Sequence, residues 1–182
     1  MNSFLFSRDE FSLPGVQYRS VAFFSLNDKL ERDEICRQLT AFKEAGFGGV
    51  FFHSRIGLLD EYLGEIWFDR IDAGVQKAGE LGLNSWFYDE DKWPSGFAGG
   101  IVPRQDPDFR ARCLLRVAKN QTLDPDDSLL FEDDDYHYLC HTYPMGDPSF
   151  NGTAWVDLLN PGTVKAFLEC TYRPYALSLI HI

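Results

Sequence analysis

The sequence predicts an α/β fold, and three observations carry that prediction. Apolar runs that begin near residues 21, 49 and 85 alternate with two segments of helical periodicity. Their spacing of about 30 residues is that of βαβ units, which build parallel sheets. The first strand-to-helix turn, SLNDKLE, lacks the glycines that a dinucleotide-binding sheet needs there. We therefore predict a partial (β/α)8 TIM barrel that consists of its first three βα units, with an antiparallel β insertion after strand 3.

The first predicted strand is the apolar run from Val21 to Leu26, and an amphipathic helix follows it. Asp28 and Glu31 have the spacing of a capping box, so we expect the helix to begin near Asp28. We expect it to end at Gly46, a residue type favoured just after a helix. Its apolar face has spacings of four and three residues and consists of Ile35, Leu39 and Phe42.

The second and third strands are predicted in GGVFFHSR and LNSWFY, with a helix between them. The second strand is apolar on both sides, which is typical of a buried parallel strand. The helix lies in EIWFDRIDAGVQKAGELG and is expected to end at Gly82. Its packed face is predicted to consist of Trp67, Ile71, Val75 and Ala78.

After Gly100 the helical and strand-like pattern changes. DFRARCLLRVAKN, YHYLCHTYPM and TAWVDLLN are predicted strands, with the acidic, turn-rich QTLDPDDSLLFEDDD between the first two. A helix follows, with Asn160 as its N-cap, Pro161 in its first turn and Pro174 limiting it. The predicted parts are an N-terminal extension (1–17), the first barrel units (18–100), the β-rich insertion (101–157), barrel helix 3 (158–176) and an irregular tail (177–182).

A full barrel of this kind needs about 250 residues, and the chain has 182. We therefore expect an N-terminal fragment of a longer protein, whose last residues are foreign to it. The alternative is a short protein with an irregular tail.

Composition excludes several kinds of partner. The net charge is −11, so an acidic surface would repel nucleic acid and anionic membranes. No apolar run is long enough to span a bilayer and no secretory leader is recognisable, so we expect a cytoplasmic protein. The four cysteines, Cys36, Cys113, Cys140 and Cys170, have neither zinc nor disulfide spacing and are expected to be reduced, although Cys113 and Cys140 lie in strands that could approach each other.

Polar residues stand at the end of each predicted parallel strand, where active sites of such folds lie. The candidate substrate-binding residues are Asn27, His53, Arg55, Asp89, Glu90, Asp91 and Trp93. Helix capping explains Asn27 equally well, and His53 could simply bond to the backbone. Arg55 could pair with Asp89 or Glu90 or orient a hydroxyl of a substrate. In an extended segment, Asp89 and Asp91 would face one side and Glu90 the other.

Three segments resemble the start of the catalytic barrel of bacterial glycoside hydrolases. They are FFSLNDKLERDEICRQLTAFKEAGFGGVFFHSR, GVQKAGELGLNSWFYDEDKWPSGFAGG and VDLLNPGTVKAFLECTYRPYA, and they cover most of residues 18–176. The resemblance is to the family 106 α-L-rhamnosidase-like enzymes, and YDEDKWPSGFAGG is its most distinctive part.

That resemblance implies hydrolysis of O-glycosyl bonds by the full-length parent, with two catalytic carboxylates on later strands. We carry over no catalytic residue, and we expect this chain to bind carbohydrate but to be inactive alone. No cofactor is expected, although the resemblance implies that calcium is possible. The alternatives are a non-catalytic carbohydrate-binding module and a metal-dependent TIM-barrel hydrolase, in which His53 with Asp89 or Asp91 would hold the metal.

Overall fold

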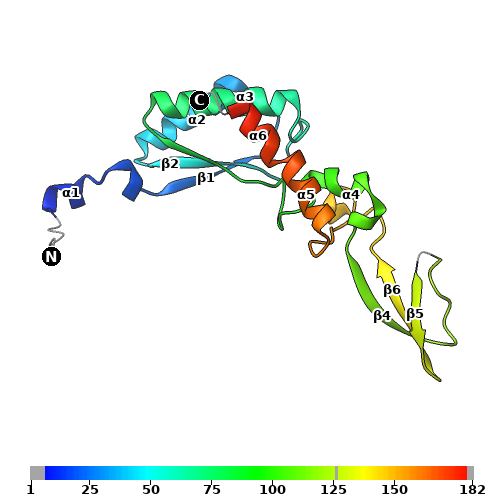
Figure 1. Cartoon of the computed structure of the whole chain (residues 1–182). Coiled ribbons are helices and arrows are strands. Elements are labelled where there is room, and N and C mark those ends of the chain that lie inside the picture. The colour runs from blue at the N-terminus through cyan, green and yellow to red at the C-terminus, as the bar shows by residue number, and fades with distance from the viewer. Residues whose placement is uncertain (1–6, 126, 180–182) are drawn as a thin grey trace. The chain divides into compact units, whose positions relative to one another are not determined.

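A computed structural model describes residues 7–125 and 127–179 of the chain. These residues form two compact units. Unit 1 consists of described residues within Met1–Trp93 and Pro174–Ile182, and unit 2 consists of those within Pro94–Arg173. The chain is mixed α/β and contains two small sheets (Figure 1).

Unit 1 is built on a three-stranded parallel sheet in the order β1-β2-β3. The strands are β1 (Val21–Leu26), β2 (Gly49–Ser54) and β3 (Asn84–Phe87). Both strand pairs are parallel, with Phe23, Phe51 and Trp86 in one register row. The predicted strands and their parallel order are thus confirmed. Three parallel strands do not by themselves establish the predicted partial barrel.

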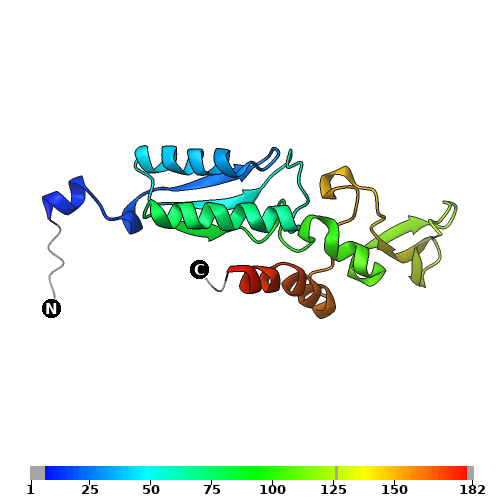
Figure 2. The same cartoon turned by 90° about the horizontal axis from the view of Figure 1, so that it is seen from above.

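Two helices cover one face of this sheet (Figure 1). They are α2 (Arg32–Glu44) and α3 (Glu65–Glu80), and they run side by side over the strands (Figure 2). The apolar core between the helices and the sheet includes Phe24, Leu26, Ile35, Leu39, Val50, Phe52, Trp67 and Ile71. The short helices α1 (Arg8–Ser12) and η1 (Val16–Tyr18) precede β1.

The two helices end as predicted, but α2 begins later than predicted. Gly46 and Gly82 have positive φ values of 86° and 64° and follow the last residues of α2 and α3. The N-cap of α2 is Glu31, without a side-chain cap, so the capping box expected at Asp28 is wrong.

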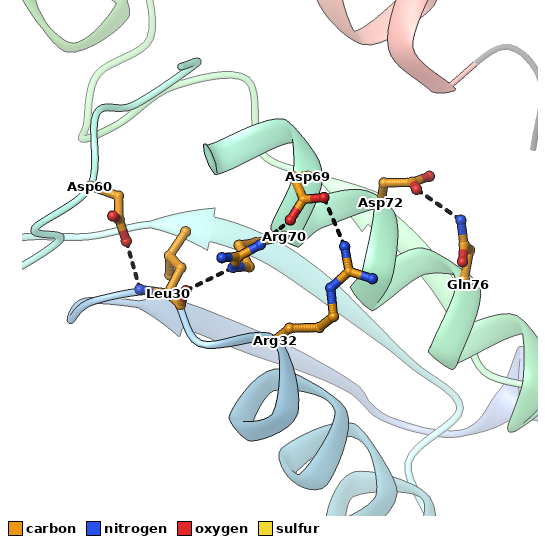
Figure 3. A network of polar contacts seen from close by, with 7 residues as sticks. All are labelled: Leu30, Arg32, Asp60, Asp69, Arg70, Asp72 and Gln76. Carbon is orange, nitrogen blue, oxygen red and sulfur yellow. Dashed lines mark hydrogen bonds and ion pairs between the residues drawn. The ribbon is translucent and has the colours of Figure 1, made fainter. Parts of the chain in front are cut away.

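Tertiary contacts explain this late start, because they hold Leu30 in a loop. The Leu30 N–H donates to Asp60 Oδ2 at 2.6 Å, and the Leu30 carbonyl accepts from Arg70 Nε at 2.9 Å (Figure 3). Arg32 extends the network by bonding Asp69 at 2.7 Å. Both partners of Leu30 lie far along the sequence, so no local pattern marks this loop.

Among the described residues of unit 1, no helix lies over the second face of the parallel sheet (Figure 1). Alternate residues of the strands reach this face, and the row Phe23, Phe51 and Trp86 makes it aromatic. Phe51 stacks on Trp86 with ring centres 5.4 Å apart. Phe23 and Trp86 are both exposed. Parallel sheets are usually covered on both faces, so this face is the unusual feature of unit 1.

Unit 2 contains an antiparallel sheet in the order β4-β6-β5. The strands are β4 (Arg112–Ala118), β5 (Ser128–Glu132) and β6 (Tyr136–Thr142). An antiparallel sheet is predicted here, but β5 lies in the acidic segment that was expected to be turn-rich and not to form a strand. TAWVDLLN is not a strand: it makes isolated bridges at Thr153 and Val156.

The cysteines of this sheet do not pair. Cys113 lies opposite His141, and Cys140 lies opposite Leu114, so the two cysteines are one position out of register. Adjacent positions along a strand point to opposite faces. Within the described residues none of the four cysteines forms a disulfide.

Short helices complete unit 2 around a second apolar core. They are η2 (Ala98–Gly100), α4 (Ile101–Gln105), η3 (Pro107–Phe109), η4 (Pro148–Phe150) and α5 (Pro161–Cys170). The core consists of Phe97, Ala98, Val102, Val156 and Phe167. Asn160 caps α5 by accepting from the Gly162 N–H at 2.9 Å, and Pro161 lies in the first turn, as predicted.

The helix predicted over 158–176 is two helices. After α5, α6 runs over Tyr172–Leu179. Pro174 lies in the first turn of α6, where proline is tolerated, so it does not end the helix as predicted. Residues 177–179 are helical, whereas 180–182 lie outside the described residues. No helix in the described ranges has the length and apolar character needed to cross a bilayer.

Candidate functional site

The carboxyl ends of the three parallel strands meet at one edge of the unit 1 sheet. Leu26 lies beside Ser54 in the register, and Phe52 lies beside Phe87. The residues that follow the strands therefore leave the sheet at the same edge. We call this edge the rim and define it as residues 27–28, 53–55 and 88–93; all seven predicted site residues belong to it.

The rim brings three of those residues into one cluster. The His53 ring centre lies 4.4 Å from that of Tyr88 and 6.4 Å from that of Trp93. Phe23 completes the cluster, with its ring 4.6 Å from His53. The Arg55 guanidinium lies 4.6 Å from the centre of the Trp93 ring, a cation–π contact. We call Phe23, His53, Arg55, Tyr88 and Trp93 the His53 cluster.

Phe23 was missed as a site residue. It stands in the middle of β1, three residues before the strand ends. Alternation along β1 puts Phe23 and Ser25 on one face, and Ser25 lies beside His53 in the register. A period-of-two reading that started from His53 could therefore have identified Phe23.

His53 is a buried polar side chain with unused hydrogen-bonding capacity. Its exposed fraction is 0%, and neither ring nitrogen has a hydrogen-bond partner among residues 7–125 and 127–179. Burial, and next the positive charge of Arg55, lower the pKa of His53 to about 4, against the opposing charge of Asp91. The imidazole is therefore neutral at pH 7 and offers one donor and one acceptor.

Two of the three consecutive acids are buried in unit 1. Glu90 and Asp91 are both buried, and the Ser54 hydroxyl donates to Asp91 Oδ1. Glu90 Oε1 accepts from the Asp91 N–H at 2.8 Å. The chain bends after β3 instead of continuing as a strand, so the expected alternation of Asp89 and Asp91 against Glu90 is wrong.

Besides burial, the charges of these carboxylates contribute to the raised pKa values of two tyrosines of unit 1, Tyr62 and Tyr175. Burial raises the pKa of Tyr62 well above its ordinary value, and the charges of Tyr175, Glu90, Asp91 and Asp89 add to the effect. Burial likewise raises the pKa of Tyr175, whose hydroxyl accepts from Trp67 Nε1 at 3.0 Å. The negative charge at 89–91 therefore acts on the interior of unit 1 as well as on the rim.

Asn27 lies in a different feature of the rim. It lines a hollow of about 400 Å³ whose polar lining is Ser25, Asn27, Asp28, Lys29, Glu31, Glu34 and Gln38. Within the described residues, no hydrogen bond or ring contact links Asn27 to the His53 cluster. The loop after β2 does pack on Asn27: a Cβ at Gly57 would lie 2.5 Å from the Asn27 carbonyl oxygen.

In the part of the chain that the structure describes, no group of three or more His, Cys, Asp or Glu side chains is placed to hold a metal ion. His53 and Asp91 interact electrostatically, but a third ligand does not join them. The metal-dependent alternative thus gains no ligand set from the fold.

Comparisons with known proteins add one distant similarity. No protein-family model matches the chain, and no curated protein matches it. Among solved structures, a rhamnosidase from Novosphingobium sp. PP1Y is similar, with 18% identity and a TM-score of 0.45. The similarity covers 65% of this chain and 12% of that one. The function proposed next therefore rests on the geometry of the rim.

Proposed function

We propose that the rim of unit 1 binds a saccharide ring, and that unit 1 is the beginning of a (β/α)8 glycoside hydrolase barrel. The observation that carries the proposal is the surface formed by Trp93 and Phe23. Trp93 is 57% exposed, Phe23 is 47% exposed, and their ring centres lie 6.4 Å apart. Exposed aromatic rings of this kind offer flat apolar faces beside polar groups, which is what the C–H face of a sugar requires.

The side chains around this surface fit the hydroxyl groups of such a ring. Arg55 supplies several N–H donors and is held in place by its contact with Trp93. His53, which is neutral at pH 7, is fully buried beneath this surface, so we assign to it the support of the Phe23 and Trp93 rings rather than contact with the sugar. Asp89 is half-buried and supplies carboxylate oxygens. A neutral polyol can use donors and acceptors together, and the net charge of −11 disfavours an anionic ligand.

The remaining predicted residues have supporting roles in this proposal. Asp91 and Glu90 are buried, and Ser54 fixes Asp91 beneath the rim. We therefore assign to them the positioning of the 88–93 segment rather than contact with the sugar. Asn27 lies in the neighbouring hollow, which could take the next ring of an oligosaccharide.

No catalytic role is assigned to any residue. Glycoside hydrolysis needs two carboxyl groups on either side of the scissile bond. The buried positions of Glu90 and Asp91 suit structural carboxylates better than this pair. We propose that the catalytic pair belongs to later strands of the parent barrel. The same observation favours the second candidate function, a binding module without catalytic activity.

Saccharide binding can be tested on the full chain. We expect neutral methyl glycosides to change the tryptophan fluorescence, and Trp93→Ala to weaken their binding by about tenfold or more. Tyr18→Ala is the matched control, because Tyr18 is an aromatic residue of unit 1 that is 78% exposed and precedes β1. Equal affinities for the wild-type chain and Trp93→Ala would refute the rim proposal. Turnover of an aryl glycoside by the isolated chain would refute the assignment of catalysis to later strands.

A further inference from the structure

A second hollow lies wholly within unit 2 and shares no lining residue with the proposed rim. Its volume is about 460 Å³, within the range of about 300–1,000 Å³ that is usual for small-molecule sites. The residues that line it include Arg112, Tyr143, Phe150, Trp155, Asp157 and Leu158. All of them belong to Pro94–Arg173, so the hollow is a property of that unit alone.

Backbone hydrogen bonds between three segments hold the walls of the hollow. The Ala111 N–H donates to the Trp155 carbonyl at 2.8 Å, and the Asp157 N–H donates to the Phe109 carbonyl at 2.8 Å. The Tyr143 N–H donates to the Ala111 carbonyl at 2.9 Å. These bonds connect the segments around 109–112, 143 and 155–157. The backbone that surrounds the hollow is therefore held in place without a ligand.

The rings of Phe150 and Trp155, which we call the floor of the hollow, pack against the core of unit 2. The ring centres of Phe150 and Trp155 lie 5.5 Å apart at an interplanar angle of 34°. Both rings also pack on Phe97, which is fully buried. Tyr143 also lines the hollow, is 45% exposed, and carries its own hydroxyl group. A rigid ring with an exposed neighbour is a ready surface for a flat, apolar ligand face.

Two charged side chains, Arg112 and Asp157, also line the hollow and have unused hydrogen-bonding groups. Asp157 Oδ1 accepts from the Leu159 N–H at 3.0 Å, and no other hydrogen bond reaches this carboxylate within the described ranges. Arg112 Nη2 donates to Asp108 Oδ1 at 2.6 Å, and among the described residues its other N–H groups make no hydrogen bond. The hollow therefore offers an acceptor and several donors beside aromatic rings.

We propose that this hollow is a second saccharide-binding site, which takes a neutral pyranose ring. A purely apolar ligand would desolvate Asp157 and Arg112 without replacing their hydrogen bonds to water, which is costly. An anion would meet the Asp157 carboxylate and the acidic chain. A ligand with an apolar face and neutral hydroxyl groups satisfies the floor, the carboxylate and the guanidinium together. The site does not depend on the rim proposal, because it shares no residue with it.

The test uses the full chain and three neutral probes, the methyl pyranosides of glucose, galactose and L-rhamnose. Saturation-transfer NMR detects binding, and calorimetry gives the affinity. We expect Tyr143→Ala and Asp157→Asn each to weaken binding at this hollow by about tenfold. Asp157→Asn keeps an oxygen for the Leu159 N–H, so it preserves the local turn. Phe131→Ala is the matched control, because Phe131 is an aromatic residue of unit 2 that is 55% exposed and lies in β5, outside the hollow.

The variants separate this site from the rim. Binding that Tyr143→Ala and Asp157→Asn weaken, but Trp93→Ala and Phe131→Ala do not, supports the hollow. Binding that only Trp93→Ala weakens overturns the hollow and leaves the rim intact. A wild-type chain that binds none of the probes overturns both. An unchanged thermal transition shows that Tyr143→Ala is folded, and if it is not, Asp157→Asn decides the outcome.

Discussion

The hydroxyl of Ser54 donates a buried hydrogen bond to the carboxylate of Asp91, across 37 positions of the sequence. The bond joins the last residue of β2 to the acidic segment that follows β3. Trp93 stands two residues beyond Asp91, and it stacks with His53 and with Arg55. The bond therefore fixes the segment that carries the most exposed ring of the proposed sugar surface.

Ser54→Ala should destabilise unit 1 and loosen this segment. The substitution removes one donor from a buried carboxylate, which costs about 1–3 kcal/mol. Urea unfolding followed by tryptophan fluorescence measures the change in the free energy of unfolding. The control is Ser85→Ala, because Ser85 is a half-buried residue of β3 for which no side-chain hydrogen bond is present within the described ranges. Equal stabilities of the two variants would show that the Ser54 bond contributes nothing.

His53 should make the stability of unit 1 fall as the solution is acidified. Its pKa is about 4 in the folded chain against an ordinary 6.5, so between these pH values the unfolded chain binds the proton more readily. The stabilisation is fully present above pH 6.5 and is lost as the pH falls to 4. Each pH unit of this gap corresponds to about 1.4 kcal/mol, so the total loss is about 3 kcal/mol.

The variant His53→Phe separates this effect from the titration of carboxylates. It should remove the acid-dependent loss, and it should leave the stability at pH 7 unchanged or higher, because no described residue bonds the imidazole. The difference between wild type and variant, measured by urea unfolding at several pH values, isolates the histidine. An NMR titration of the His53 ring with a midpoint near 6.5 would contradict the prediction.

The parts of the fold that were predictable from the sequence are those with local causes. The strands of unit 1 are apolar runs between polar residues, and Gly46 and Gly82 end their helices because each adopts a positive φ. The strand β5 was missed because every one of its residues is exposed, so no burial pattern marks it. Its pairing with β6 through the backbone is what defines it.

The site was predictable only in part, for a similar reason. The order of the parallel strands places His53, Arg55 and Trp93 at one edge, and the sequence alone indicates that edge. The bend after β3 decides which carboxylates become buried, and it depends on distant contacts such as that of Ser54 with Asp91. The inclusion of Phe23 depends on the register between β1 and β2.

Asp60→Ala should destabilise the loop that leads from the rim into α2. Leu30 is buried, and loss of the Asp60 carboxylate leaves its N–H without the acceptor at 2.6 Å. We expect a cost of about 1–3 kcal/mol and faster hydrogen exchange of the Leu30 amide.

Gln76→Ala provides the comparison for Asp60→Ala. It breaks only the exposed bond between Gln76 and Asp72, four residues apart on α3 (Figure 3). It should therefore change the stability by less than about 0.5 kcal/mol. Unaltered exchange at Leu30 in Asp60→Ala would show that the loop is held by other contacts.

Two glycine-to-alanine substitutions in unit 1 should have opposite signs. Gly57 has a φ of +109°, and a Cβ there would lie 2.5 Å from the Asn27 carbonyl oxygen. Gly57→Ala should therefore cost about 1–3 kcal/mol and displace the loop that carries Asn27. Gly79 lies inside α3 with no atom within 4 Å of an added Cβ, so Gly79→Ala meets no clash. It should stabilise the chain by about 0.5–1 kcal/mol, because alanine loses less backbone entropy on forming a helix. Thermal unfolding of the two variants and the wild type measures both changes in stability. A Gly57→Ala chain as stable as the wild type would show that the loop after β2 does not pack tightly against the end of β1.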